Sequence, residues 1–294
     1  MKRQGLSERD LLSLRVFCAV AEAGGFAPAE TSLGMSKATI SRHIKDVETH
    51  LSAKLCERGP AGFALTEAGD VALRVAREAL DALERIKPEV DGVRGVLSGP
   101  LLLGSAEHVM AHEDCHLVEA ITELQRTAPL VRPTLTVMAF GDLGRALTDR
   151  RVQIAIRGKY KPIPGLRHYP LFDETQRVFY CPSHAGVIAA HSDTRSLPLV
   201  CRRHPFVTDA LANHGFTPGP DVDGLEAVAT MIATGRYVGL LPEHYVAKLG
   251  PRYQFDVLPD SPHYTVPFCA IVEEARGLTR SAEAFLEILL AAHR

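Results

Sequence analysis

The sequence lacks the features that define several protein classes. No run of 18 apolar residues occurs in its 294 positions, so we expect no membrane-spanning helix. The N-terminus begins Met-Lys-Arg-Gln-Gly and holds no apolar core of a signal peptide. Hydrophobic residues make up 46% and charged residues 23%, which excludes a long disordered or collagen-like chain. These absences predict a cytoplasmic globular protein, and its length predicts two or more domains.

Paired cysteines are also missing. The six cysteines stand at positions 18, 56, 115, 181, 201 and 269, and no two of them form a CxxC motif. Scattered thiols of this kind are typical of small core residues in a reducing compartment, rather than of a disulfide framework or a zinc site. Cys115 is the cysteine that we expect to be exposed.

Nucleotide-binding and hydrolase motifs are absent with one exception. The chain has no GxxxxGK[ST] phosphate loop, no GxSxG nucleophile elbow and no GxGxxG dinucleotide loop. The exception is His112-Glu113-Asp114-Cys115-His116, which matches the HExxH signature of zinc hydrolases. A metal-dependent hydrolase is therefore the alternative against which any other predicted function is compared.

The surroundings of this motif do not favour catalysis. A helix from about 105 to 126 would place His108, His112 and His116 on one face, together with Glu119. The opposite face carries the apolar stripe that we expect to be buried, namely Met110, Leu117, Ile121 and Leu124. The histidines would then face solvent or a partner subunit, whereas a catalytic HExxH helix faces an enclosed cleft with a third ligand. We expect no catalytic metal, no cofactor and no enzyme.

Charge is spread almost evenly along the chain, which excludes a bulk binder of polyanions. Residues 1–65 hold nine Lys and Arg against seven Asp and Glu, residues 66–91 hold four against seven, and residues 92–294 hold 20 against 21. A site for nucleic acid must therefore be a local patch, and only the first segment has a positive balance.

The first 65 residues predict three helices and a hairpin. Apolar residues at helical spacing predict a helix over about 8–22, which Gly24-Gly25 ends. A short helix over 26–33 follows, with Pro28 in its first turn, and Ser36 then caps a third helix to about Leu51. Two short apolar stretches around the glycine and proline turn at 59–62 predict a hairpin wing.

The third helix has one apolar face and one face without acidic residues. Its buried stripe is predicted to comprise Ile40, Ile44, Val47 and Leu51, at spacings of four, three and four. A slim helix with a small, polar and basic outer face fits the DNA major groove, where it donates hydrogen bonds to base edges and places cations near phosphates. The predicted DNA-binding residues are Ser36, Lys37, Ala38, Thr39, Ser41, Arg42 and Lys45 on this helix and Arg58 in the wing. A three-helix domain with an incidentally basic face is the structural alternative.

Residues 66–91 predict a long helix. Its apolar residues recur every three or four positions: Val71, Val75, Ala79, Leu83, Ile86 and Val90. This stripe is either a flap packed on its own domain or a seam between two copies of the chain. We favour the seam because the segment is long and lacks aromatic bulk. Pro88 should kink or end the helix, and glycines at 92, 95 and 99 mark the start of the next domain.

At this point the sequence resembles a known family. Residues 11–70 are similar to the DNA-binding domain of LysR-type transcriptional regulators. The matching residues are Phe17, Phe26, Ala29, Leu33, Ser36, Ile40, Ser41, Arg42, Ile44, Glu48, Leu51, Leu55, Arg58, Leu65-Thr66 and Ala68-Gly69. The resemblance implies a winged helix-turn-helix regulator that binds a partly palindromic site in double-stranded promoter DNA as a homodimer or homotetramer. Departures at Ala27, Glu30, Lys37 and Cys56 affect the target sequence and affinity rather than the fold.

The remaining residues, 92–294, alternate between predicted strands and helices. Strands at about 101–103, 135–140 and 153–156 alternate with helices at about 105–126 and 142–151. A second set comprises a strand at 177–181, a strand at 199–200, helices near 185–190 and 224–235, and a strand at 237–241. A strand at 268–272 and a final helix with Leu278, Phe285 and Leu289 on one stripe would rejoin the first set. This alternation is typical of an α/β domain with parallel strands.

The same family resemblance extends, more loosely, to this part. It implies an effector-binding domain with two Rossmann-like lobes, similar to a periplasmic binding protein and controlled by a small molecule. Lobe 1 would comprise about 92–162 and 266–294, and lobe 2 about 163–265. The predicted organisation is therefore a winged helix-turn-helix domain at 1–65, a dimerisation helix at 66–91 and an effector domain at 92–294.

Ligands in open α/β sheets bind beyond the carboxyl ends of the strands, often against helix N-termini. This rule selects the predicted effector-binding residues: Ser105, Ala106, Glu107, His108, Phe140, Gly141, Arg157, His204 and Thr208. The resemblance makes Ser105 the first choice. The serine, arginine and histidines would suit a carboxylate, whereas Glu107 and Asp142 would suit an amine. Pairing of Arg157 and the histidines with local acids is the structural alternative.

Overall fold

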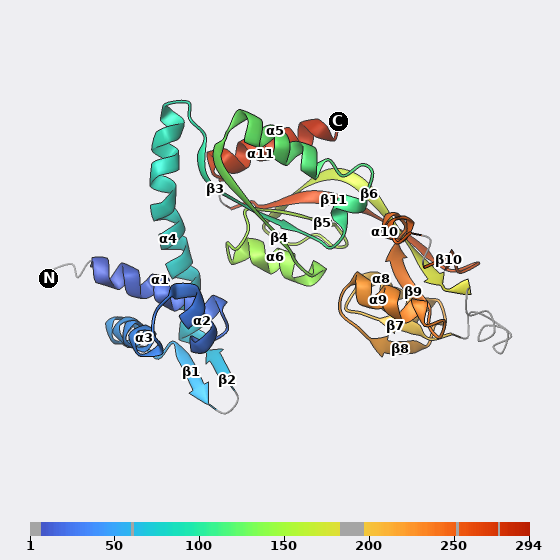
Figure 1. Cartoon of the computed structure of the whole chain (residues 1–294), viewed down its shortest axis with the longest axis horizontal. Helices are drawn as coiled ribbons and strands as arrows, with labels where there is room; N and C mark the ends of the chain where they lie inside the picture. The colour runs from blue at the N-terminus through green and yellow to red at the C-terminus, as the bar shows by residue number, and fades with distance from the viewer. Residues whose placement is uncertain (1–6, 60–61, 183–196, 251–252, 276) are drawn as a thin grey trace. The chain divides into compact units, whose positions relative to one another are not determined.

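A helical N-terminal unit and a larger α/β unit make up the chain, with limits at Met1–Lys87 and Pro88–Arg294. The computed structural model describes residues 7–59, 62–182, 197–250, 253–275 and 277–294 (Figure 1). Within these ranges no helix is both long enough and apolar enough to cross a membrane. The predicted helix near 185–190 lies outside the described residues.

The N-terminal unit is a winged helix-turn-helix, as predicted. Its elements are α1 (Glu8–Glu22), α2 (Phe26–Leu33), α3 (Lys37–Leu51) and the antiparallel hairpin of β1 (Cys56–Gly59) and β2 (Gly62–Leu65). Side chains cap the longer helices: Ser7 accepts from the Asp10 amide at α1, and Ser36 accepts from the Thr39 amide at α3. The core of the unit centres on the fully buried Phe17, Ile40 and Ile44.

One residue of the predicted α3 stripe is not buried. Ile40, Ile44 and Val47 are buried, but the side chain of Leu51 is 44% exposed. Leu51 is the last residue of α3 and lies at an apolar groove beside Val71 and Val75. Its exposure follows from its position at the helix end, where no further element among the described residues covers it.

The long predicted helix is α4 (Glu67–Val93), and it continues through Pro88 instead of ending there. One face packs on the N-terminal unit through Leu73, Ala76 and Leu80. A second apolar stripe on the same helix is exposed, at Val71, Val75, Leu83, Ile86 and Val90. The exposure of this second stripe favours the seam over the flap, and the seam stays a prediction.

The α/β unit is built on a mixed sheet. Its order is β10-β6-β11-β5-β3-β4, and β9 pairs with β6. The strands are β3 (Ser98–Ser105), β4 (Leu130–Val137), β5 (Ile154–Gly158), β6 (Leu166–Tyr180), β9 (Gly239–Pro242), β10 (Asp256–Val257) and β11 (His263–Glu273). Only β3, β4 and β5 are parallel in this sheet, whereas β6 and β11 run antiparallel to each other and to their remaining neighbours. The predicted parallel strands are therefore present in lobe 1, and antiparallel strands that the local pattern did not predict join them.

Helices cover both faces of the sheet in each lobe. In lobe 1, α5 (Leu117–Thr127) and α11 (Arg280–Ala292) share one core, and α6 (Phe140–Thr148) packs on the opposite face (Figure 1). In lobe 2, α8 (Pro205–Asn213) shares one core with strand residues, while α9 (Leu225–Ala233) and α10 (Glu243–Lys248) share another. The short parallel pair of β7 (Leu199–Cys201) and β8 (Pro218–Asp221) extends lobe 2. This arrangement confirms the predicted two-lobed α/β architecture.

Two predicted strands had wrong limits. The strand expected at 135–140 is β4, which lies at the sheet edge and begins at Leu130. Pro133 lies within β4, and an edge strand tolerates a proline. The strand expected at 177–181 is only the end of the 15-residue β6. Both strands are longer than their local apolar pattern because pairing with neighbours extends them.

The HExxH segment is not helical. A short 3-10 turn spans Val109–Ala111, and α5 begins only at Leu117. His108 has a left-handed φ of 56°, and Met110 is 72% exposed, so the predicted helix from 105 to 126 and its buried Met110 are wrong. Rings from elsewhere hold the segment, since His108 lies 4.2 Å from Tyr245 and His112 lies 4.4 Å from Phe172 between ring centroids.

Two further expectations for this segment change with it. Cys115 is buried in the lobe 1 core and is not the exposed thiol that we expected. The histidines of the HExxH segment contact rings of the same chain instead of lying on the outer face of a helix. In the part of the chain that the structure describes, no group of three or more His, Cys, Asp or Glu could hold a metal ion. The hydrolase alternative therefore lacks the helical zinc-binding geometry on which it depended.

Gly69 is a close-contact position in the first turns of α4. A Cβ at this position would lie 2.0 Å from the carbonyl oxygen of Leu55. Gly69→Ala should therefore destabilise the N-terminal unit by about 1–3 kcal/mol, because backbone must move to admit the methyl group. Thermal and urea unfolding measure the change. Gly141→Ala is the matched control, since this helical glycine has open space around the added Cβ, and an equal effect of both substitutions would contradict the prediction.

Candidate DNA-binding face and effector cavity

The outer face of α3 is accessible and basic. Its exposed side chains are Ser36, Lys37, Ala38, Arg42 and Lys45, with Thr39 and Ser41 partly exposed. They lie opposite the buried Ile40, Ile44 and Val47. All seven predicted α3 residues thus lie on one side of the helix or beside it, which is the arrangement that a groove-binding helix needs.

The acidic side chains of α3, which could repel DNA, are engaged in hydrogen bonds within the N-terminal unit. Asp46 accepts a hydrogen bond of 2.7 Å from Arg9, and Glu48 accepts one of 2.8 Å from the Leu55 amide. His43 is 2.9 Å from the hydroxyl of Ser13. These contacts direct the two carboxylates of α3 toward α1 and the segment before the wing. Because both acids are engaged there, the basic residues determine the charge of the outer face.

Two positions outside this face remain, namely Glu30, a departure from the family pattern, and Arg58, the last of the predicted DNA-binding residues. Glu30 of α2 accepts a hydrogen bond from the backbone amide of Lys37. This carboxylate therefore caps the first turn of α3, where its charge is favourable. Glu30, which departs from the family pattern, thus has a structural role in this chain. Arg58 lies in β1, paired with Phe63 of β2.

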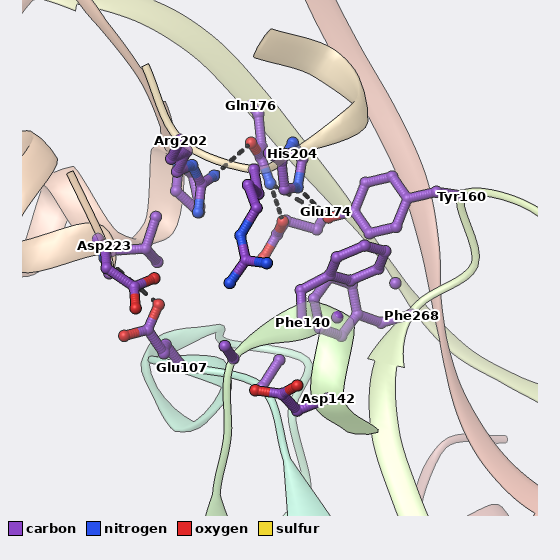
Figure 2. A pocket seen from close by; sticks show the side chains of 18 of the residues that line it. Glu107, Phe140, Asp142, Tyr160, Glu174, Gln176, Arg202, His204, Asp223 and Phe268 are labelled. Atoms are coloured by element: carbon purple, nitrogen blue, oxygen red, sulfur yellow. Dashed lines mark hydrogen bonds between the residues drawn. The ribbon is translucent and has the colours of Figure 1, made fainter. Parts of the chain in front are cut away.

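A cavity of about 330 Å³ lies between the two lobes of the α/β unit (Figure 2). Its walls come from the segments after β3, β5 and β7, the first turns of α6 and α9, and the middle of β6 and β11. The lining residues are Ala106, Glu107, Ala139, Phe140, Gly141, Asp142, Arg145, Gly158, Tyr160, Glu174, Gln176, Arg202, Arg203, His204, Asp223, Gly224, Leu225, Pro242 and Phe268. The cavity therefore lies where the strand-end rule expects a ligand.

The structure brings together five of the nine predicted effector-binding residues. Ala106, Glu107, Phe140, Gly141 and His204 all line the cavity, as does the alternative amine ligand Asp142. They come from three separate strand ends in the two lobes. Within lobe 1 their convergence reflects the parallel strands β3 and β4, whose carboxyl ends lie at the same edge.

The other four predicted residues are not among those that line the cavity. Ser105 is buried and donates its hydroxyl proton to the carbonyl of Ala106. His108 contacts Tyr245, and the exposed Thr208 donates to the carbonyl of His204. Arg157 is buried behind the wall, where it donates to the carbonyl oxygens of Phe140 and Gly158 and lies 4.0 Å above the Phe140 ring.

Several cavity residues escaped the sequence reasoning. The main polar ones are Tyr160, Glu174, Gln176, Arg202, Arg203 and Asp223. Glu174 and Gln176 alternate along β6, where the local pattern predicted no strand before residue 177. The arginines directly precede His204, so the strand-end rule could have included them. Asp223 precedes a predicted helix and had a similar signal.

A hydrogen-bonded network crosses the wall formed by β6. Gln176 donates to Glu174 over 2.7 Å and accepts from Arg202 over 3.3 Å. The Nδ1 atom of His204 accepts from the Phe206 amide, so its Nε2 carries the proton and donates to the hydroxyl of Tyr160 over 2.9 Å. Figure 2 shows these side chains grouped along one wall of the cavity. The network orients five polar side chains, of which Glu174, Gln176 and His204 are buried.

Burial shifts the protonation of this wall. Burial raises the pKa of Glu174 to about 7, although hydrogen bonding to Gln176 and the charge of Arg202 lower it in part. Burial, with the charges of Arg202 and Arg157, holds the pKa of His204 far below its ordinary value, so this imidazole is neutral. Burial also lowers the pKa of Arg202, and its Nε atom is buried without a hydrogen-bond partner. The cavity wall thus contains an unsatisfied cationic donor.

Three helix N-termini meet at the cavity. Their N-cap residues are Ala139 for α6, His204 for α8 and Gly224 for α9, and all three line it. The side chain of His204 caps α8, whereas α6 and α9 have no capping side chain at the N-cap position. Glu107 supplies the missing partner for α9, because its carboxylate accepts from the Leu225 amide over 3.3 Å. Together these termini favour negative charge in the cavity.

Comparison with known proteins assigns both units of the chain. A model of the LysR substrate binding domain matches residues 94–294, and a model of the bacterial regulatory helix-turn-helix protein, lysR family, matches residues 11–70. The chain belongs to the LysR family of transcriptional regulators. The HTH-type transcriptional regulator CrgA of Neisseria meningitidis is 30% identical to this LysR-type regulator over 241 residues, which cover 81% of this chain and 72% of CrgA. The HTH-type transcriptional activator BauR of Pseudomonas aeruginosa is 28% identical over 289 residues, which cover 96% of this chain and 95% of BauR.

Solved structures of full-length LysR-type proteins share the fold. CbnR has a TM-score of 0.65 at 20% identity, covering 97% of this chain and 99% of CbnR. A variant of full-length OxyR from Pseudomonas aeruginosa has a TM-score of 0.65 at 22% identity, covering 99% and 96%. These likenesses confirm the predicted fold class, and the relatives named here are regulators of transcription.

Arg42 is the test of the α3 face. Arg42→Ala should weaken binding to promoter DNA by about 1–3 kcal/mol, because it removes an exposed cation from the outer face without touching the core. Fluorescence anisotropy over a range of salt concentrations measures the affinity. Arg236→Ala removes an exposed arginine from the other unit and should leave the affinity unchanged. Wild-type affinity of Arg42→Ala at every salt concentration would show that the assigned face is wrong.

Glu174 makes the stability of the α/β unit depend on pH. Its folded pKa of about 7 lies above the unfolded value of 4.5, so the folded state holds a proton that the unfolded state has lost. The free energy of unfolding therefore falls as pH rises from 4.5 to 7. Glu174→Gln removes this loss, and its stability relative to wild type should rise by up to about 3 kcal/mol across that window.

Urea unfolding of both proteins at matched pH values measures this difference. His204 titrates in the opposite sense but is present in both proteins, so its contribution cancels. Glu287→Gln is the control, since this carboxylate is exposed on α11. A pH-independent difference between Glu174→Gln and wild type would contradict the assignment.

Proposed function

We propose that this LysR-type regulator binds promoter DNA as a homodimer through the outer faces of two α3 helices. The observation that carries the proposal is the exposed basic face of α3, with its acids engaged elsewhere. The proposed DNA-binding residues remain Ser36, Lys37, Ala38, Thr39, Ser41, Arg42, Lys45 and Arg58. A helix of this kind reads base edges in the major groove, while flanking cations bind phosphates. We place the protein in the cytoplasm, where its DNA target lies.

The exposed stripe of α4 supports the dimer. It borders an apolar groove of about 640 Å³ in the N-terminal unit. Residues of α1, α3 and α4, such as Leu51 and Val75, line the groove together with Leu55, which precedes β1. A second copy of α4 would cover the groove and the stripe together. A two-fold dimer of this kind presents two α3 helices to two half-sites, which matches a partly palindromic target.

The domain limits that we propose are 1–65, 66–91 and 92–294. The middle segment corresponds closely to α4, which begins at Glu67 and ends at Val93. Because α4 begins in the helix-turn-helix unit and ends in the α/β unit, it is the covalent connection through which ligand binding in one would affect the other.

A small molecule in the cavity between the lobes supplies the control. The proposed effector contacts are Ala106, Glu107, Phe140, Gly141 and His204, with Ser105 and Arg157 supporting the wall from behind. A ligand that contacts both lobes binds one relative placement of the lobes better than others, and so shifts their equilibrium. Effector binding and promoter binding are then linked by a coupling free energy, so that each ligand changes the affinity for the other by the same factor.

Val75 tests the dimer and its role in DNA binding. Val75→Lys should produce monomers and weaken binding to a full palindromic site about tenfold or more, because the seam cannot bury an ammonium group and the second half-site is lost. Analytical ultracentrifugation gives the oligomeric state, and anisotropy gives the affinity. Val75→Ala shortens the same side chain without adding charge and should remain a dimer. A dimeric Val75→Lys variant with wild-type affinity would rule out the seam on α4.

A further inference from the structure

The cavity between the lobes is lined by charges of both signs. Its cations are Arg145, Arg202 and Arg203. Its carboxylates are Glu107, Asp142, Glu174 and Asp223. Among the residues that the structure describes, no salt bridge joins an arginine of this set to one of its carboxylates. The charges are therefore not held in ion pairs with one another, although Glu107 and Glu174 are near enough to act on the charge of Arg202.

The arginine side of the cavity can accept an anionic group. Arg202 donates to Gln176 through one terminal nitrogen, and its Nε atom is buried with no hydrogen-bond partner. An orphaned donor of this kind costs free energy, and the guanidinium that carries it belongs to a residue that lines the cavity. The first turn of α6 adds backbone amides at the N-cap residue Ala139, where no side chain caps the helix. A carboxylate bound here would pair with Arg202 and face the positive end of α6.

The acidic side of the cavity can accept an ammonium group. Glu107 extends from the end of β3 to the N-terminus of α9, where it accepts from the Leu225 amide. Asp223 stands two residues before Leu225, and Figure 2 shows its carboxylate facing that of Glu107. Two neighbouring carboxylates attract positive charge. An ammonium group between them would contact both lobes at once.

A ligand with a single charge suits this cavity poorly. A simple carboxylate would satisfy Arg202 but leave Glu107 and Asp223 facing each other. A simple amine would do the opposite, and would add positive charge beside an unsatisfied arginine. Burial raises the pKa of Glu174 to about 7, and a protonated Glu174 leaves three arginines against three carboxylates in the lining. The lining therefore favours a ligand with no net charge and two separated charged groups.

The third wall of the cavity is aromatic. Phe140, Tyr160 and Phe268 line it, and Phe140 and Tyr160 pack edge to face with ring centroids 4.4 Å apart. Such a wall suits a short aliphatic chain between the two charged groups. The volume of about 330 Å³ lies at the small end of the range for ligand pockets.

We infer that the effector is a small zwitterion, an amino carboxylate whose ammonium group binds between Glu107 and Asp223 and whose carboxylate binds at Arg202. The inference rests on the proposed function, in that it takes the cavity between the lobes as the effector site. It narrows the ligands expected at that site from small molecules in general to those with one positive and one negative group. It also explains why both a carboxylate-binding and an amine-binding set of residues lie in one cavity.

The test compares matched ligands on the full-length protein. The zwitterions are ω-amino carboxylates from glycine to 6-aminohexanoate and the common L-α-amino acids. For each ω-amino carboxylate, the single-charge controls are the fatty carboxylate and the alkylamine of the same chain length. Thermal shift identifies binders, and isothermal titration calorimetry gives their Kd. At least one zwitterion should bind about tenfold or more tightly than both of its controls.

Two variants assign the charged groups. Asp223→Asn should reduce the zwitterion to the affinity of its carboxylate control, and Arg202→Gln should reduce it to that of its amine control. Exposed residues outside the cavity provide matched controls, Asp256→Asn and Arg236→Gln, which should bind as wild type does. Because Arg202 is largely buried, Arg202→Lys retains the charge and should retain part of the preference if the Gln variant is unstable.

The outcomes separate this inference from the proposed function. The inference is overturned if no zwitterion binds, or if a carboxylate or amine alone binds as tightly as its zwitterion. Promoter binding by wild type, measured in parallel, tests the proposed function on its own. A single-charge ligand that binds and changes promoter affinity would support a ligand-controlled regulator and refute the zwitterion. A zwitterion that binds without changing promoter affinity would support this inference and refute control by the cavity.

Discussion

The antiparallel pairing of β6 with β11 is the constraint on which the α/β unit depends. The two strands pair from Leu166 with Glu273 to Arg177 with His263, and so run through both lobes. In lobe 1, β11 also pairs with β5, and in lobe 2, β6 also pairs with β9 and β10. Each lobe therefore adds its helices to the same two strands. The cavity forms where these strands pass from one lobe to the other, around Glu174 and Phe268.

This position explains why the centre of the sheet is polar. A strand buried on both faces would ordinarily be apolar throughout, yet β6 carries Glu174 and Gln176 in its buried middle. Both side chains are tolerated because each has a partner, in a network that includes Arg202. The partners do not satisfy everything, since one nitrogen of Arg202 has none. A polar wall with an unmet donor stabilises the fold less than an apolar wall would, which is the expected cost of a ligand site.

The N-terminal unit depends instead on a local set of hydrogen bonds that joins α3, the segment before β1 and the start of α4. Glu48 of α3 accepts from the Leu55 amide, and the carbonyl of Leu55 accepts from the Thr66 amide at the start of α4. The hydroxyl of Thr66 then accepts from the amide of Gly69, whose missing side chain lets the Leu55 backbone approach. These four residues are among those that carry the family resemblance. The geometry thus gives a physical reason for the spacing of that motif.

The amino-acid sequence alone determined the helix-turn-helix unit, the long α4 and the outer face of α3. Helices and hairpins depend on periodicity, caps and turns within a few residues, so local patterns were sufficient. The same reasoning selected five lining residues of the cavity, because strand ends are local features. Only the tertiary structure decided that Glu174, Gln176 and Tyr160 join them, and that the HExxH segment is not a helix. Those outcomes depend on the pairing of strands about ninety residues apart and on ring contacts between His112 and Phe172, which no local pattern records.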